Sequence, residues 1–226
     1  MQARSERTRH NLIQAGARMF DEHGYASATL GRIVAVTGVT KGALYFHFAS
    51  KDVLADAVQQ EGSDLLVGFL RSREDSGAPP VQVLIDMTHW LSRALREDPL
   101  VGAGLRITHE CVDREPPVTD FYRVWNREVL RLLRWAGEAG DLRAAGRGEG
   151  AATLLWAMVC WLAAVAKALP ADELDRRLAA SWDLLLTMLV PPDEAARYRI
   201  RTADQLGLRA PHPTQEPGPL EPHHAP

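Results

Sequence analysis

The sequence has few of the features that mark secreted or membrane-spanning proteins. Its two cysteines, Cys111 and Cys160, lie too far apart in a chain of 226 residues to suggest a disulfide framework. The first residues, MQARSERTRHN, lack the apolar segment of a signal peptide. The most apolar stretch, Ala151 to Leu169, includes Lys167 and is slightly shorter than the about 20 residues of a membrane-spanning helix. We therefore expect a soluble, cytoplasmic protein with no membrane contact.

Arrangements of catalytic or metal-binding residues are also lacking. His89, His109 and several carboxylates make an enzyme conceivable, but no Ser/His/Asp or Cys/His arrangement, phosphate loop or metal spacing supports one. His109, Glu110 and Cys111 are consecutive, whereas metal ligands on a helix need a spacing of three or four residues. We expect neither enzymatic activity nor a metal or cofactor.

Charge is nearly balanced over the whole chain but uneven along it. Residues 1–51 contain seven lysines and arginines against three acidic residues, a net charge of +4. The rest of the chain contains 19 basic and 26 acidic residues, a net charge of −7. Chance alone could produce this difference, but a basic head on an acidic body also suggests that the head binds a polyanion.

The hydrophobic pattern is helical throughout. Apolar residues recur at spacings of three and four, and no segment alternates with a period of two. The pattern predicts an all-α protein of nine or ten helices with a small basic head (1–51), a helical body (52–203) and a disordered Pro-rich tail (204–226). The expected helices cover about 5–22, 29–36, 40–48, 52–71, 80–96, 98–110, 118–138, 149–169 and 172–189, with a short piece at 193–206.

The stretch TLGRIVAVTGVTKGALYFHF predicts a helix-turn-helix unit. Two short helices joined by a tight turn at Gly38 would pack on the preceding longer helix and present the start of the second helix to the major groove of DNA. Two of the three lysines of the chain, Lys41 and Lys51, lie in or beside it. A helical hairpin with merely solvated polar residues is the plainer alternative. The residues expected to contact DNA are Thr29, Thr40, Lys41, Gly42, Tyr45, His47, Lys51 and Arg9.

Aromatic residues in the body suggest a cavity between helices. Trp90, Phe121, Tyr122, Trp125, Trp156 and Trp161 are spread over three expected helices, and an indole N–H needs a hydrogen-bond partner when buried. Each tryptophan could equally be ordinary core. Small-molecule sites between helices are mostly apolar with a few polar groups. The residues expected to bind a ligand are Trp125, Trp90, Tyr122, Phe121 and Thr108.

Residues 7–58 resemble the DNA-binding domain of TetR-family transcriptional regulators, chiefly in GYASATL, GVTKGALYFHF and SKDVL. One departure is Val34, which stands where the family usually has alanine. The resemblance implies an all-helical homodimer with amino-terminal helix-turn-helix units and a carboxy-terminal ligand-binding bundle. It also implies that the helices at about 149–169 and 172–189 form the dimer interface, through a stripe that includes Leu154, Leu155, Met158, Leu162, Val165, Leu178, Trp182, Leu185 and Leu189.

The segments KGALYFHF, PLVGAGLRITHE and PPVTDFYRVWNREVLRLL resemble the γ-butyrolactone (A-factor-type) receptor subgroup. The resemblance implies a repressor that binds double-stranded operator DNA, is released by a small diffusible lactone, butenolide or furan signal, and controls antibiotic biosynthesis. It places Trp125 against the ligand. The alternative within the family is a regulator of efflux or catabolic genes that answers to an unrelated apolar molecule. A helical scaffold that binds only protein would leave Lys41, Gly42 and Tyr45 unexplained.

Overall fold

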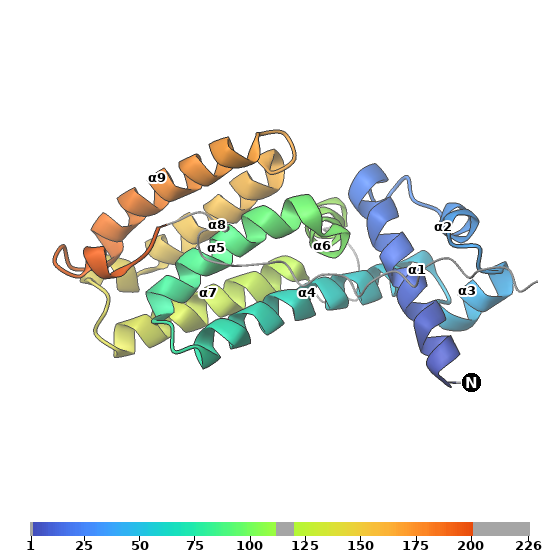
Figure 1. Cartoon of the computed structure of the whole chain (residues 1–226), viewed down its shortest axis with the longest axis horizontal. Coiled ribbons are helices and arrows are strands. Elements are labelled where there is room, and N and C mark those ends of the chain that lie inside the picture. Colours follow the sequence, from blue (N-terminus) through green and yellow to red (C-terminus); the bar gives the residue numbers. More distant parts are fainter. Residues whose placement is uncertain (1, 112–119, 201–226) are drawn as a thin grey trace, which may run out of the picture.

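The computed structural model describes residues 2–111 and 120–200, and within them every long element is an α-helix (Figure 1). The expectation of an all-α fold is confirmed. The expected Pro-rich tail, the break at Pro116–Pro117 and residues 201–206 of the last expected piece lie outside the described residues. The helices are α1 (Gln2–His23), α2 (Leu30–Thr37), α3 (Lys41–His47), α4 (Lys51–Asp75), α5 (Pro80–Glu97), α6 (Pro99–Glu110), α7 (Phe121–Glu138), α8 (Glu149–Val165) and α9 (Ala171–Leu189), with 3-10 turns at Ala144–Arg147 and Ala195–Arg197.

Local signals define the two short helices α2 and α3. The hydroxyl of Thr29 accepts a hydrogen bond from the backbone N–H of Arg32, and that of Thr40 accepts one from Ala43, so both are N-caps. Gly38 ends α2 with a φ of 65°, a left-handed conformation that glycine adopts without steric cost. The turn between the two helices is therefore set by the sequence TGVT itself.

The head has its own apolar core, and this core extends into the body. Ile33 of α2 and Leu44 of α3 pack with α1 side chains, with Leu54 near the start of α4 and with Ile107 of α6. The expected boundary after residue 51 thus coincides with the start of a helix that belongs to both parts. A movement of α4 or α6 is therefore transmitted to the head through direct packing.

Helix α4 connects head and body and runs from the head along one side of the body in Figure 1. Its N-cap is Ser50, whose hydroxyl accepts a hydrogen bond from Val53, so the helix begins at Lys51, one residue before the expected start. Asp52 accepts a hydrogen bond from the hydroxyl of Tyr25, across the head. Serine and aspartate both favour the N-cap position of a helix, and tertiary packing decided that Ser50 caps α4 while Asp52 bonds Tyr25.

The larger core surrounds α5, which is buried along almost its whole length by the other body helices. Its buried Asp86 accepts hydrogen bonds from Arg73 at 2.7 Å and from Gln82 at 2.8 Å. The indole N–H of Trp182 donates to Thr88 at 2.7 Å. Most polar groups in this core are thereby satisfied, as burial requires.

Helices α8 and α9 form a pair on one side of the body (Figure 1). The expected interface stripe is wrong in detail, because most of its residues are buried inside the subunit: Leu155, Leu162, Leu178, Trp182 and Leu189 are each at most 2% exposed. One subunit already needs these side chains to cover α5 and α7. The apolar residues exposed on the pair are Leu154, Trp156, Leu184 (70%) and Met188. Of the expected stripe, Leu154 is exposed, whereas most of the other residues face the core of the subunit.

Candidate nucleic-acid interface and ligand site

The start of α3 presents the predicted DNA-contacting group. Lys41, Gly42 and Tyr45 are all exposed, Tyr45 to 57%. A Cβ added at Gly42 would meet nothing within 4 Å, so the protein's own packing does not require glycine there. Lys41 makes no hydrogen bond or ion pair with the described residues. The ammonium group of Lys41, the phenol of Tyr45 and the uncovered backbone of Gly42 are therefore all accessible to a partner.

The two capping threonines also face solvent. Thr29 and Thr40 use a hydroxyl lone pair to accept a backbone N–H, which leaves each O–H free to donate. His47 is partly exposed and packs edge-on against Phe46, with ring centroids 5.1 Å apart. Hydroxyl and imidazole donors around a basic helix are typical phosphate contacts.

Two of the expected cations are already engaged within the protein. The ammonium of Lys51 donates to the backbone carbonyl of Tyr25 at 2.8 Å and lies 4.1 Å from the centroid of the Tyr25 ring. The guanidinium of Arg9 lies 5.5 Å from the centroid of the Phe48 ring and 3.9 Å from Glu61. Both residues thus hold the head together as well as adding positive charge to it.

Sequence reasoning missed two exposed apolar residues on the short helices α2 and α3. Phe46 is 79% exposed and Val36 is 67% exposed. Phe46 could have been found from the helical period, because it lies off the stripe formed by Leu44 and Phe48, which are buried. Apolar side chains in the major groove contact the methyl group of thymine, so both residues are candidates for apolar contacts with DNA.

The residues expected to bind a ligand differ in burial within the described part of the chain. Trp125 and Phe121 are fully buried, and Trp90 is 3% exposed and stacks on Phe69 at 5.5 Å between centroids. Tyr122 is half-buried and its hydroxyl forms a hydrogen bond with His109 at 2.8 Å. Burial raises the pKa of Tyr122, and its neighbour Cys160 adds to the effect.

Thr108 has a positioning role at the start of α7. Its hydroxyl donates to Asp120, the N-cap of α7, at 3.0 Å. Gln59 of α4 accepts a hydrogen bond from the backbone N–H of Phe121 at 3.2 Å. These bonds join α4, α6 and α7 at one point. Helix α7 is therefore bonded directly to α4, the helix that leads to the head.

The larger core contains buried polar atoms without a partner among the described residues. They are the indole nitrogen of Trp125, both ring nitrogens of His89 and the hydroxyl of Ser63. Burial lowers the pKa of His89 to about 4, so its ring is neutral at pH 7. An unpaired buried donor costs about 1–3 kcal/mol, which a ligand that supplies an acceptor would recover. Ser63 was not anticipated from the sequence, and His89 was noted only as a possible enzymatic group.

Two hollows lie at the surface of the body. An open groove of about 580 Å³ between α7 and α8 is lined by Tyr122, Leu130 and Trp156, among others. A pocket of about 250 Å³, here called the junction pocket, lies where α1, α6 and the end of α8 meet. Tyr122 lines the groove between α7 and α8. The other four expected ligand residues line neither of these two hollows in the described part of the chain.

No helix in the described ranges is both long enough and apolar enough to span a bilayer.

Two family models match the chain. Residues 12–58 match "Bacterial regulatory proteins, tetR family", and residues 79–191 match "Tetracyclin repressor-like, C-terminal domain".

Curated relatives include the A-factor receptor protein of Streptomyces griseus, which is 36% identical over 62% of this chain and 48% of its own length. The repressor DhaR of a Mycobacterium species is 38% identical over 55% of this chain and 59% of its own. The chain thus matches about half the length of these curated relatives.

Solved structures are similar over most of the chain. CprB of Streptomyces coelicolor superposes with a TM-score of 0.73 at 32% identity, over 91% of this chain and 98% of that one. A γ-butyrolactone receptor described as ArpA-like gives 0.71 at 33% identity, over 86% and 94%. CprB in complex with its operator sequence gives 0.68 at 33% identity, over 86% and 94%. The similarity therefore includes head and body together.

Proposed function

The chain belongs to the TetR family of bacterial regulatory proteins, and on that premise we propose that it is a homodimeric repressor that a small apolar signal of the γ-butyrolactone, butenolide or furan type releases from operator DNA. The family is one of transcriptional regulators, and the chain is not an enzyme. The observation that carries the proposal is the exposed group of Lys41, Gly42 and Tyr45 on a capped helix above a separate, mostly apolar body core.

DNA binding is supported by the chemistry of the α3 surface. Lys41 supplies a cation that reaches guanine acceptors or phosphate, and the uncrowded backbone at Gly42 permits close approach. In a homodimer, two such helices about 34–36 Å apart enter successive major grooves. The similarity to CprB bound to its operator supports the same use of this surface.

Signal binding is supported by the unpaired donor in the body core. A lactone, butenolide or furan combines an apolar body with an oxygen acceptor, and Trp125 offers a buried indole N–H with no acceptor among the described residues. Trp125 is fully buried in this structure, so we propose that α7 moves relative to its neighbours when the signal binds. The similarity to proteins described as γ-butyrolactone receptors favours this signal class.

Release is proposed to pass through α4. Leu54 and Val58 of this helix belong to the head core, and Leu66 and Leu70 belong to the body core. A ligand that binds better to a state with α4 displaced lowers operator affinity by its differential affinity for the two states, typically about 1–3 kcal/mol. The bonds of Gln59 to α7 give the displacement a direct route.

Dimerisation is assigned to the outer face of α8 and α9. Leu154, Leu184 and Met188 are 46%, 70% and 45% exposed, and exposed apolar residues gathered on two neighbouring helices favour a self-complementary contact.

The test is a fluorescence anisotropy titration with duplexes taken from upstream of the protein's own coding region. We expect tight binding that is reversed by a γ-butyrolactone and not by the ring-opened hydroxy acid with the same carbon skeleton. Release by an unrelated apolar molecule and not by lactones would instead favour the efflux or catabolic alternative. Failure to bind any such duplex would overturn the assignment of the operator.

A further inference from the structure

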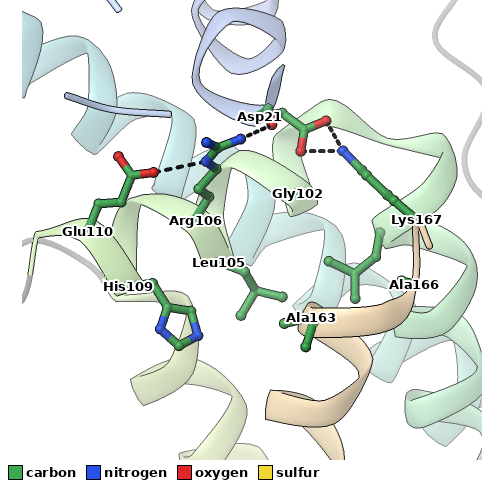
Figure 2. A pocket seen from close by; sticks show the side chains of 11 residues that line it. Asp21, Gly102, Leu105, Arg106, His109, Glu110, Ala163, Ala166 and Lys167 are labelled. Carbon is green, nitrogen blue, oxygen red and sulfur yellow. Dashed lines mark hydrogen bonds and ion pairs between the residues drawn. The ribbon is translucent and has the colours of Figure 1, made fainter. Parts of the chain in front are cut away.

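The junction pocket lies between head and body (Figure 2). One of its sides is apolar and is formed by Leu95, Leu105, Ala163 and Ala166. Its polar end holds the ion pair between Asp21 of α1 and Lys167, which follows the end of α8. At about 250 Å³ it is smaller than the about 300–1,000 Å³ of drug-sized sites. An occupant must therefore be small and have one apolar and one polar end.

Asp21 is largely buried in the pocket and is paired with a cation. Its side chain is 13% exposed, and it packs so closely on Gly102 that an added Cβ there would lie 2.3 Å from its carboxylate oxygen. Asp21 also lies in the last turn of α1, where the helix dipole disfavours negative charge. Lys167 supplies the cation and donates to both carboxylate oxygens at 2.5 Å.

Lys167 is the member of the pair that can be replaced. Its side chain is 53% exposed, so its ammonium group can return to water at little cost. The other cation of the pocket, Arg106, is held by Glu110 at 2.9 Å and by the backbone carbonyl of Asp21 at 2.8 Å (Figure 2). Removing Lys167 therefore leaves the Asp21 carboxylate without an ion-pair partner among the described residues.

A neighbouring carboxylate strengthens the preference for positive charge. Asp98 caps α6 through the backbone N–H of Leu100 at 2.9 Å. Burial raises the pKa of Asp98, and the negative charge of nearby Asp21 raises it further. The two carboxylates thus repel each other, and a cation at Asp21 relieves that repulsion as well.

We propose that the junction pocket is a second small-molecule site, which binds a primary amine with a short apolar chain by exchanging its ammonium group for that of Lys167 at Asp21. The apolar chain would lie on Leu105 and Ala163. This site is separate from the core around Trp125 and does not depend on the identity of the signal bound there. Occupancy breaks the ion pair that ties α1 to the end of α8, and so uncouples head from body on that side.

The probe is hexylamine, which is protonated at pH 7, titrated into the full-length protein by calorimetry. Hexanoate and hexanol serve as anionic and neutral controls of the same chain length. Lys167→Ala removes the internal competitor and should strengthen hexylamine binding about two- to fivefold. Asp21→Asn should weaken it by about tenfold or more, because a charge-assisted hydrogen bond is lost.

Ala163→Leu fills the apolar side without altering charge and should also block binding, which keeps the test valid if Asp21→Asn does not fold. Lys41→Ala, in the head surface away from the pocket, should bind hexylamine as the unaltered protein does. Equal binding of hexanoate, or an affinity for hexylamine that Lys167→Ala leaves unchanged, would overturn the proposal.

Discussion

Lys41 and Lys51 lie ten residues apart in the basic head. Replacing Lys41 by alanine should weaken DNA binding, whereas replacing Lys51 by alanine should lower the stability of the fold. Lys41 is exposed and makes no hydrogen bond or ion pair with the described residues, whereas Lys51 donates to the backbone of Tyr25 and lies against its ring. The two substitutions remove the same charge. They therefore separate a residue proposed to contact DNA from one that holds the head together.

The structure gives the size of each effect. Lys41→Ala removes one major-groove contact in each half-site, worth about 1–3 kcal/mol, and two cations per dimer, so the slope of log affinity against log salt should fall by about 2. The free energy of unfolding should change by less than about 0.5 kcal/mol, as at other exposed sites. Lys51→Ala loses a charge-assisted hydrogen bond and a cation–π contact, and we expect a loss of about 1–3 kcal/mol of stability.

The assays are operator titrations at several salt concentrations and urea unfolding of both variants. Arg134→Ala, on the exposed surface of α7, is the control for removing a positive charge outside the head. The reasoning is refuted if Lys41→Ala binds operator with unaltered affinity and salt dependence. It is equally refuted if Lys51→Ala weakens DNA binding while its unfolding curve stays unchanged.

Four further predictions concern the body and the helix caps. Trp125→Phe should retain operator binding but lose release by a lactone, as judged by anisotropy; release at the original lactone concentration would contradict the role of the indole N–H. Ser50→Ala should lower the urea unfolding free energy by about 0.5–2 kcal/mol, since it removes the cap of α4. Burial lowers the folded-state pKa of His89 to about 4, so stability should fall as pH drops from about 6.5 to 4, by up to about 3 kcal/mol, and His89→Leu should remove that part of the pH dependence. Leu184→Arg should shift the protein toward monomer in sedimentation, whereas Val53→Lys, at an exposed position near the start of α4, should not.

Much of the fold followed from local sequence signals. The helical period identified the long helices to within a few residues of their observed ends, although α8 stops at Val165 rather than at residue 169. The last expected piece, from residue 193, contains in its described part only the short turn Ala195–Arg197. The turn at Gly38 and the cap at Thr40 placed α2 and α3, because both act within a few residues.

The candidate sites were predicted unevenly. Lys41, Gly42 and Tyr45 lie together as expected, because one short helix carries all three. The expected ligand residues come from α5, α6 and α7, and the sequence could not show that Trp125 would be sealed in the core while Tyr122 lines a surface groove. Whether these residues bind DNA or a signal stays a prediction.

The sequence by itself determined an all-helical chain with a basic helix-turn-helix head, because helix period, capping and turn chemistry depend on near neighbours. Tertiary structure alone decided which apolar stripe of α8 and α9 faces outward, which lysine is free and which is bound, and that Asp21 meets Lys167 across 146 positions of sequence. Those outcomes depend on contacts between distant segments, and burial and charge pairing are properties of the packed chain rather than of any local pattern.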